Sequence, residues 1–447
     1  MITMNTIANI AQTLWAPATH LHTEGLSYHA YLTDLTWLLL LKTAPAIGNS
    51  VPVHLSWETL NHKPAKEQYD YYQEVIKEMG EVSDPHIAGI YAHARSSFKN
   101  SEQLTQVISR LAAIDNVPTE NLGEIYETLL DMCAYQNSNR LHIAPRSLVD
   151  LMVILIQPQP NELIQDPLAG TASFVVAADE YIKVMSDELP KTKITKMINR
   201  QNFIAIEPDL ARQRLALMNC LLHDIDHPQH VPVRWGDSLL SNLAVWPSAD
   251  VILSMLVFAS DPTDELSKYD TTLALLQHIT QILKPGGRAA VVLPDKILKA
   301  GGPAQEVRSE LLDTCVLHTV LRLPHGIFYP HTVSAHILFF RKGKTASEKT
   351  QTVWFYDLRT HCPIFGQYLH LTREHLMSFE KTYGDDPLGE NPRSEGKNWR
   401  CFSRESLAEQ GDILDNLEDE GMLTEKIWDV LDNTRANLET LKDILGK

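Results

Sequence analysis

Asp166-Pro167-Leu168-Ala169-Gly170-Thr171-Ala172-Ser173-Phe174 is the stretch of the sequence that decides the fold. An apolar approach, residues 162–165, precedes it, and residues 175–178 follow it with helical character. A strand, a turn of small residues and a helix together direct backbone N–H groups and a helix N-terminus at the negative end of a ligand. Asp166 at the strand end and Gly170 in the turn therefore predict a small cofactor close to the backbone. These nine residues alone also fit an ordinary strand–helix turn.

Short apolar segments alternate with helical stretches on both sides of this turn. Stretches such as 211–222 and 272–283 have helical character, and such alternation predicts βαβ units around a mostly parallel sheet. The last two strands are expected to face each other across Pro324-His325-Gly326. The predicted strands are Leu163–Gln165, Phe203–Ile206, Val231–Trp235, Val251–Ser254, Ala289–Leu293, Val316–Leu323 and Ala335–Arg341.

Both ends of the chain read as helical. Apolar residues at helical spacing, such as Ile7, Ile10 and Leu14, predict a small helical domain at the N-terminus. Near the C-terminus, apolar residues alternate spacings of four and three, which is a heptad seam with one polar position. This helix would pack either on its own domain or on a partner. The seam consists of Ile427, Leu431, Thr434, Leu438, Leu441 and Leu445.

Charge limits the way in which this chain could bind nucleic acid. The 447 residues carry a formal net charge of −17. A protein that wraps phosphate backbones alone is usually basic, because Lys and Arg displace counterions. The chain therefore either does not bind nucleic acid or binds it through a local patch, with a partner supplying the rest.

The cysteines and the apolar runs indicate the compartment. Five scattered cysteines with no Cys-x-x-Cys pair favour a reducing cytoplasm and argue against disulfides or structural zinc. No basic region followed by an apolar run opens the sequence, so we expect no signal peptide. The longest apolar run, Trp37-Leu38-Leu39-Leu40-Leu41, is too short to cross a bilayer. We expect a cytoplasmic protein without a membrane segment.

Two acidic residues follow later strands at positions that suit a nucleotide-like cofactor. Glu207 ends the strand after the opening turn, where an acid can accept both hydroxyls of a ribose. Asp237, in Gly236-Asp237-Ser238, follows the next strand and could accept from an adenine amine. Residues 282–294 then close a helix and turn into a strand. Each feature alone is a weak signal, whereas their order and spacing together are specific.

With these features the sequence resembles the modification (HsdM) subunit of type I restriction–modification systems, in the adenine-specific DNA methyltransferase class. The resemblance extends nearly from end to end and includes the S-adenosylmethionine turn. The matching segments are Gly25–Tyr28, Asp166–Phe174, Leu215–Ile225, Leu283–Pro294, Leu323–Tyr329 and Phe355–Thr360.

The resemblance implies an α/β fold, a class I (Rossmann-like) methyltransferase with an N-terminal helical domain and a C-terminal helix. We predict a helical domain over 1–127, a methyltransferase-like domain over 128–345, an extension and linker over 346–400, and a C-terminal helical region over 401–447. It further implies that two such subunits join one specificity subunit, which reads double-stranded DNA, and that a nuclease subunit can join. Because the specificity subunit would read the DNA bases, the net negative charge of this chain is explained. The C-terminal heptad helix would pack on the specificity subunit.

The catalytic positions of the family are degenerate here. The family has Asn-Pro-Pro-Phe after its fourth strand, whereas this chain has Met255-Leu256-Val257-Phe258. An Asn oxygen and a Pro carbonyl accept the two hydrogens of the adenine amine, and a thioether is only a weak acceptor. Phe258 could still stack on a flipped base. We predict no useful methyl transfer.

The cofactor side departs from the family as well. The family's Tyr-Phe-Thr-Pro is His142-Ile143-Ala144-Pro145 here, so that only Pro145 and Arg146 persist and the stacking ring is absent. The second glycine of the turn is Ser173. We predict S-adenosylmethionine binding that is weakened or lost. The cofactor-site residues implied by the resemblance are Pro145, Arg146, Asp166, Gly170, Thr171, Ala172, Ser173, Glu207 and Asp237.

Histidines and acids also gather between positions 223 and 230. His223, His227 and His230 lie near Asp224 and Asp226, but this helix end runs into a Pro-containing loop. The family match covers residues 223–225 without a metal, so we expect no metal site.

Three functions remain open from the sequence. The first is a catalytically inactive modification subunit, a pseudoenzyme that acts as a scaffold or DNA clamp in a type I-like complex for defence against foreign DNA. The second is an active adenine-specific DNA N6-methyltransferase subunit. The third is a stand-alone protein that binds a nucleotide in the old cofactor cleft.

Overall fold

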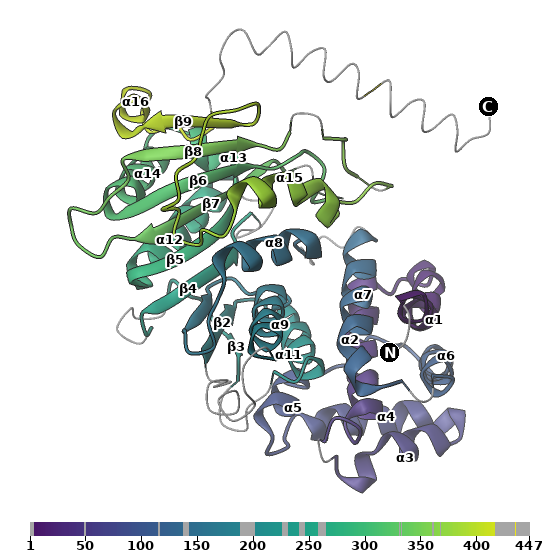
Figure 1. The fold of residues 1–447 in the computed structure, drawn as a ribbon. Helices are drawn as coiled ribbons and strands as arrows, with labels where there is room; N and C mark the ends of the chain where they lie inside the picture. Colours follow the sequence, from purple (N-terminus) through teal and green to yellow (C-terminus); the bar gives the residue numbers. More distant parts are fainter. Residues whose placement is uncertain are drawn as a thin grey trace. The chain divides into compact units, whose positions relative to one another are not determined.

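The computed structural model describes residues 4–48, 51–114, 117–136, 143–187, 202–225, 231–240, 246–257, 265–329, 331, 333–359, 362–366, 368–415 and 434 (Figure 1). The chain divides into two compact units. Unit 1 contains Met1–Ile143, Ala169–Asp179 and Asn199–Asp237. Unit 2 contains Ala144–Leu168, Glu180–Ile198 and Ser238–Lys447.

Unit 1 is mainly helical and includes one pair of parallel strands. The helix α9 (Ser173–Asp187) begins in this unit. Strands β2 (Phe203–Glu207) and β3 (Val233–Trp235) pair in parallel, with Ala205 opposite Val233. The other helices are α1 (Met4–Thr23), α2 (Tyr28–Thr43), η1 (Val53–Leu55), α3 (Trp57–His62), α4 (Ala65–Met79), α5 (Pro85–Ile90), α6 (Ser101–Ala112), η2 (Thr119–Asn121), α7 (Leu122–Tyr135) and α11 (Leu210–Leu222).

Helix α2 is the centre of unit 1. Ser27 caps it by accepting a hydrogen bond from the Ala30 N–H, and nearly all of its side chains are buried. The apolar run 37–41 lies within this helix, so it forms core and not a membrane span. Trp37 Nε1 donates to the Ile90 carbonyl at 2.9 Å, and the Arg214 guanidinium lies 5.0 Å from the Trp37 ring. Within the described part of the chain, no helix combines the length and the apolar character that a bilayer crossing requires.

Unit 2 is built on a mixed sheet with strand order β1-β4-β5-β7-β6-β8-β9. The strands are β1 (Ile164–Asp166), β4 (Ala249–Met255), β5 (Leu283–Pro294), β6 (Cys315–Arg322), β7 (Ala335–Lys342), β8 (Thr352–Asp357) and β9 (Trp399–Ser403). The helices are α8 (Arg146–Ile156), α12 (Glu265–Ile282), α13 (Asp295–Lys299), α14 (Pro303–Thr314), α15 (Arg373–Tyr383) and α16 (Arg404–Glu409).

The strand directions place several strand ends at one edge of this sheet. Strands β1, β4 and β5 are parallel to one another, and β6 is parallel to β8. Because β7 is antiparallel to both β5 and β6, those two groups run in the same direction. The carboxyl ends of β1, β4, β6 and β8 therefore meet at one edge, which we call the carboxyl edge. In open α/β sheets this is the edge that binds ligands.

All seven predicted strands are present, and the predicted pairing of 316–323 with 335–341 is confirmed by the β6–β7 ladder. Strands β8 and β9 were not predicted, and they extend the sheet beyond residue 345. The four domain bounds stay predictions. The heptad seam near the C-terminus lies outside the described residues apart from Thr434.

Candidate functional site

In unit 1 the opening turn is tied to the end of β2. Gly170 and Ala172 adopt positive φ angles of 57° and 65°. The Ala169 N–H donates to the Ile206 carbonyl at 2.9 Å, and the Gly170 N–H donates to Glu207 Oε2 at 2.9 Å. The structure thus brings two predicted cofactor residues, Gly170 and Glu207, together. Ala172 occupies a conformation that costs an L-residue with a side chain about 1–2 kcal/mol.

The Glu207 carboxylate is already largely occupied by donors of the protein. Its Oε1 accepts from the Asp209 N–H at 2.9 Å and from Arg212 Nε at 2.8 Å, in addition to the Gly170 bond at Oε2. The side chain is 1% exposed, and burial raises the pKa of Glu207 against the lowering effect of Arg212. A carboxylate has about four lone-pair positions, and three are used here. One position remains, whereas the two hydroxyls of a ribose need two.

The remaining predicted residues of unit 1 lie within this turn or just after β3. Thr171 Oγ1 and Ser173 Oγ lie 3.2 Å apart, so the turn carries a hydroxyl at the position predicted to replace a family glycine. The Thr171 carbonyl accepts from Asn219 Nδ2 at 3.0 Å, which fixes the turn on α11. Asp237 is exposed just after β3.

Trp235 is a residue of this region that sequence analysis missed. Its indole is 61% exposed at the end of β3, and Nε1 donates to the Pro208 carbonyl at 3.0 Å, next to Glu207. The sequence signal was an aromatic residue directly before the Gly236-Asp237 pair.

In unit 2, Asp166 links the ends of β1 and β4. Its Oδ1 accepts from Ser254 Oγ at 2.7 Å and from the Leu168 N–H at 3.0 Å, and the residue is 2% exposed. Ser254 directly precedes Met255. The carboxylate predicted for the cofactor therefore holds the strand that leads into the predicted catalytic positions.

The end of β4 continues the parallel ladder with β5. Met255 is half-buried and pairs with Val292. The Leu256 N–H donates to the Val292 carbonyl at 2.9 Å, and its side chain is fully buried. A proline in that position has no N–H to donate. Val257 is half-buried, and Phe258 lies outside the described residues.

Arg146 is committed to structural ion pairs. It begins α8 directly after Pro145, and its Nε donates to Asp150 Oδ1 at 2.7 Å. Its Nη2 donates to Glu180 Oε2. Ile143, predicted to replace the family's stacking ring, is half-buried, and His142 lies outside the described residues.

The described residues contain no group of three or more His, Cys, Asp or Glu side chains arranged to hold a metal ion. His223 Nδ1 lies 2.8 Å from the Asn219 carbonyl oxygen. Asp226, His227 and His230 fall outside the described residues.

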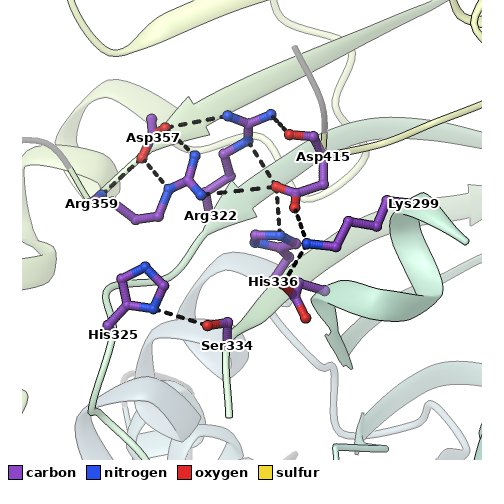
Figure 2. A network of polar contacts seen from close by, with 9 residues as sticks. Lys299, Arg322, His325, Ser334, His336, Asp357, Arg359 and Asp415 are labelled. Atoms are coloured by element: carbon purple, nitrogen blue, oxygen red, sulfur yellow. Dashed lines mark hydrogen bonds and ion pairs between the residues drawn. The ribbon is translucent and has the colours of Figure 1, made fainter. Parts of the chain in front are cut away.

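The carboxyl edge also carries an ionic network that sequence analysis did not predict (Figure 2). Arg322 ends β6 and Asp357 ends β8, and their side chains lie 3.3 Å apart. Arg359 Nη2 is 2.7 Å from Asp357 Oδ2. Asp415 receives contacts from four side chains. These are His336 at 3.0 Å, Lys299 at 3.7 Å, Arg322 at 3.8 Å and Arg359 at 4.0 Å.

The network holds its two carboxylates ionised. Burial acts to raise the pKa of Asp357, but the hydrogen bond and charge of Arg359 and the charge of Arg322 lower it to about 2. Burial likewise acts against ionisation of Asp415, while the contact with His336 and the charges of Arg322 and Arg359 place its pKa below the usual range. Arg322 Nη2 also donates to the Asp415 carbonyl at 2.5 Å. The chain is therefore fixed at Asp415.

These features together define the frame of a class I methyltransferase: a mixed sheet covered by helices, a turn of small residues, and acids at strand ends, here Asp166 and Glu207. Residues 118–416 match the N-6 DNA methylase family. The chain is 34% identical to the type I restriction enzyme EcoKI methylase subunit of Escherichia coli (strain K12) over 444 residues, covering 93% of this chain and 83% of the relative. It belongs to the N-6 DNA methylases, among the type I restriction–modification (HsdM-like) subunits. Members of this family are S-adenosylmethionine-dependent methyltransferases.

Other relatives agree with this membership. The type I restriction enzyme StySPI methylase subunit of Salmonella potsdam is 34% identical over 421 residues, covering 88% of this chain and 79% of the relative. The crystal structure of the EcoKI M protein aligns over 98% of this chain and 96% of that one, with a TM-score of 0.56 and 30% identity. A putative type I modification subunit from Vibrio vulnificus YJ016 shares the fold at a TM-score of 0.69 and 20% identity, over 91% and 94% of the two chains.

Proposed function

We propose that this chain is a catalytically silent modification subunit, which supplies structure and a DNA clamp to a type I-like complex. The observation that carries the proposal is the end of β4. Met255 stands where the family has its asparagine, and Leu256 is buried and bonded to Val292. Neither residue carries an amide side chain, and neither Leu256 nor Val257 has the proline ring that would fix its φ angle.

The chemistry explains why these positions decide the activity. The exocyclic amine of adenine is a poor nucleophile, because its lone pair is delocalised into the ring. Two well-placed acceptors for its hydrogens favour a tetrahedral nitrogen, and a Met thioether accepts only weakly. Loss of pre-placed polar groups of this kind typically costs about a hundredfold or more in rate. Phe258, in the family's fourth position, would not replace them.

Weakened cofactor binding accompanies this loss in our proposal. S-adenosylmethionine would supply an electrophilic methyl group, and Gly170, Glu207 and Asp237 are the residues that would hold it. The fit is incomplete, because Glu207 has one acceptor position left and Ser173 adds a hydroxyl to the turn. Calorimetric titration of the full chain tests this point. We expect no heat of binding in the micromolar range, and a micromolar Kd would refute it.

Family membership supports a set of partners. The EcoKI and StySPI relatives are methylase subunits of type I restriction enzymes. We propose a specificity subunit bound through the C-terminal heptad seam, a second modification subunit, and double-stranded DNA held through the complex. A nuclease subunit would join for defence against foreign DNA in the cytoplasm. Truncation before Leu417 is expected to abolish co-purification with the specificity subunit.

The deciding experiment is labelled methyl transfer to duplex DNA by the complex reconstituted with its specificity subunit. We expect no transfer above the level without protein. The matched variant is Met255→Asn with Leu256→Pro and Val257→Pro, which restores the family motif. Ordinary turnover by the natural chain would overturn the proposal.

The second candidate is an active methyltransferase subunit. Two hydrogen bonds support it, from Ser254 to Asp166 and from Gly170 to Glu207, because they hold the end of β4 and the small-residue turn in place. The same assay separates the two functions. The third candidate, a stand-alone nucleotide-binding protein, would show no co-purification with a specificity subunit.

A further inference from the structure

Residues 411–415 end the continuous part of unit 2 that the structure describes. They follow α16 and form no helix or strand. We call them the 411–415 segment. Residues near the end of a fold are usually poorly ordered unless specific contacts hold them. This segment is held by contacts with the sheet of unit 2 and with helices α13, α14 and α16.

One buried arginine of α14 holds the backbone of the segment. Arg308 is 1% exposed. Its Nε donates to the Asp412 carbonyl at 2.7 Å, and its Nη2 donates to the Gly411 carbonyl at 3.3 Å. Its Nη1 donates to the Ile297 carbonyl of α13 at 2.7 Å. Because a guanidinium presents its donors in a rigid planar fork, Arg308 fixes the segment relative to α13.

The side chain of Asp412 and the backbone of Leu414 add further contacts. The Asp412 carboxylate accepts hydrogen bonds from Ser309 Oγ of α14 and from Arg404 Nη1 of α16. The φ angle of Asp412 is 55°, in the left-handed region, which is unfavourable for most residues with a side chain. The Leu414 N–H donates to the Leu298 carbonyl at 2.8 Å, and the Leu414 side chain is fully buried. Polar and apolar contacts together therefore fix the middle of the segment.

Asp415 ends the segment at the carboxyl edge, where side chains of two strands and of α13 point towards it (Figure 2). Its carboxylate lies 3.0 Å from His336 of β7, 3.8 Å from Arg322 of β6 and 3.7 Å from Lys299. Exposed ion pairs contribute little to stability, but the Asp415 side chain is only 10% exposed and its contacts form a network. The segment is therefore fixed at its end as well as in its middle.

The region that follows the segment is the one for which we proposed a partner. The predicted heptad seam begins at Ile427, shortly after Asp415. Ordering residues on binding costs conformational entropy, and residues that are already fixed do not add to this cost. If the 411–415 segment were released, its residues would have to be ordered again when the seam binds. Its fixed position therefore favours binding through pre-organisation.

We propose that the 411–415 segment is an anchor that positions the C-terminal region for the specificity subunit and thereby sets the affinity of this contact. The inference rests on the proposed function, in which the heptad seam binds that subunit. Arg308, Arg404 and Asp415 are positioning residues, because they act through the segment. Loss of their contacts weakens the complex even when the fold of unit 2 is intact.

The double variant Ser309→Ala with Arg404→Met tests the anchor in the full chain. Both substitutions remove donors to the Asp412 carboxylate and leave Arg308 in place. Hydrogen exchange followed by mass spectrometry should become faster at residues 411–415, which include the bonded Leu414 N–H, and should not change in the β6–β7 ladder. Affinity for the specificity subunit, measured by biolayer interferometry in buffer where circular dichroism shows both proteins folded, should fall about tenfold or more.

The matched control is Arg400→Met in β9, the same substitution at an exposed arginine whose Nη1 donates to the Trp399 carbonyl. It should change neither the exchange nor the affinity. Faster exchange at residues 411–415 with unchanged affinity would overturn the inference, and so would weaker affinity with unchanged exchange. Truncation before Leu417 separates this failure from that of the proposed function. If the truncated chain bound the specificity subunit as tightly as the natural one, the proposed contact through the seam would itself be wrong, and the inference would fail with it.

Discussion

The carboxyl end of β4 carries the uncharged side chains of Met255 and Leu256. The carboxyl ends of β6 and β8, which are adjacent strands, carry instead Arg322 and Asp357, whose side chains lie 3.3 Å apart. Both regions belong to the same edge of one sheet. In our proposal the first lacks the groups that methyl transfer requires. The second joins three strands, helix α13 and Asp415 through charged side chains. Under the proposed function, this edge serves the architecture of the subunit and not methyl transfer.

Removal of Arg322 should have the largest effect. Arg322→Met leaves Asp357 and Asp415 buried with fewer cations, and breaking a buried ion pair from one side costs about 3–5 kcal/mol. Urea unfolding at neutral pH measures the change in the free energy of unfolding. Arg373→Met is the control, since Arg373 is 61% exposed in its pair with Glu380 and such pairs contribute about 1 kcal/mol or less. Equal losses in both variants would remove the contrast between the two regions.

Asp34 in unit 1 shows what a buried carboxylate does with fewer cations around it. It accepts from Tyr72 Oη at 3.0 Å and from the Ser97 N–H at 2.8 Å. Burial raises its pKa to about 6, against the lowering effect of these hydrogen bonds and the charge of Arg214. Because the folded state holds the proton more tightly, its contribution is present below the unfolded pKa of 3.8 and is lost as pH rises through about 6.

The natural chain should therefore lose about 2.5 kcal/mol of stability between pH 4 and pH 7 through Asp34, and Asp34→Asn should not show this loss. Urea unfolding of both proteins at the two pH values measures it. Parallel pH dependence in the natural chain and in the variant would show that the hydrogen bonds to Asp34 offset its burial.

Asp357 should give the opposite sign in a different pH range. Its folded pKa of about 2 lies below the model-peptide value of 3.8, so its stabilisation is complete above 3.8 and is lost as pH falls towards 2. The shift corresponds to about 2 kcal/mol. Asp357→Asn should flatten the unfolding free energy between pH 4 and pH 2. If the free energy of unfolding of Asp357→Asn fell between pH 4 and pH 2 as steeply as that of the natural chain, the loss of stability in acid would have to come from Asp415 alone.

Sequence reasoning reached the strands more completely than the side-chain contacts. Runs such as Ala289–Leu293 reveal buried strands, because both faces of a covered parallel strand are apolar. It missed β8, although the family resemblance included Phe355 and Asp357. It could not foresee the Arg322–Asp415 contact, which joins residues 93 positions apart. Sequence reasoning identified Glu207 as a residue that could bind the cofactor. It could not predict that Arg212 donates a hydrogen bond to Glu207 Oε1, because this contact depends on the side-chain rotamers.

That occupation leads to the prediction with the smallest expected effect. Arg212→Ala frees one lone-pair position on Glu207 Oε1, so that the carboxylate could accept both ribose hydroxyls. Affinity for S-adenosylmethionine should rise about tenfold, equivalent to about 1.4 kcal/mol. Because the Arg212 charge lowers the pKa of Glu207, titration at about pH 8 keeps the carboxylate ionised in the variant. Arg234→Ala, an exposed arginine of β3 in the same unit, should leave the affinity unchanged. Weaker binding by Arg212→Ala would assign Arg212 the opposite role, that of orienting Glu207 for the ribose, and the incomplete fit would then have to be traced to Ser173.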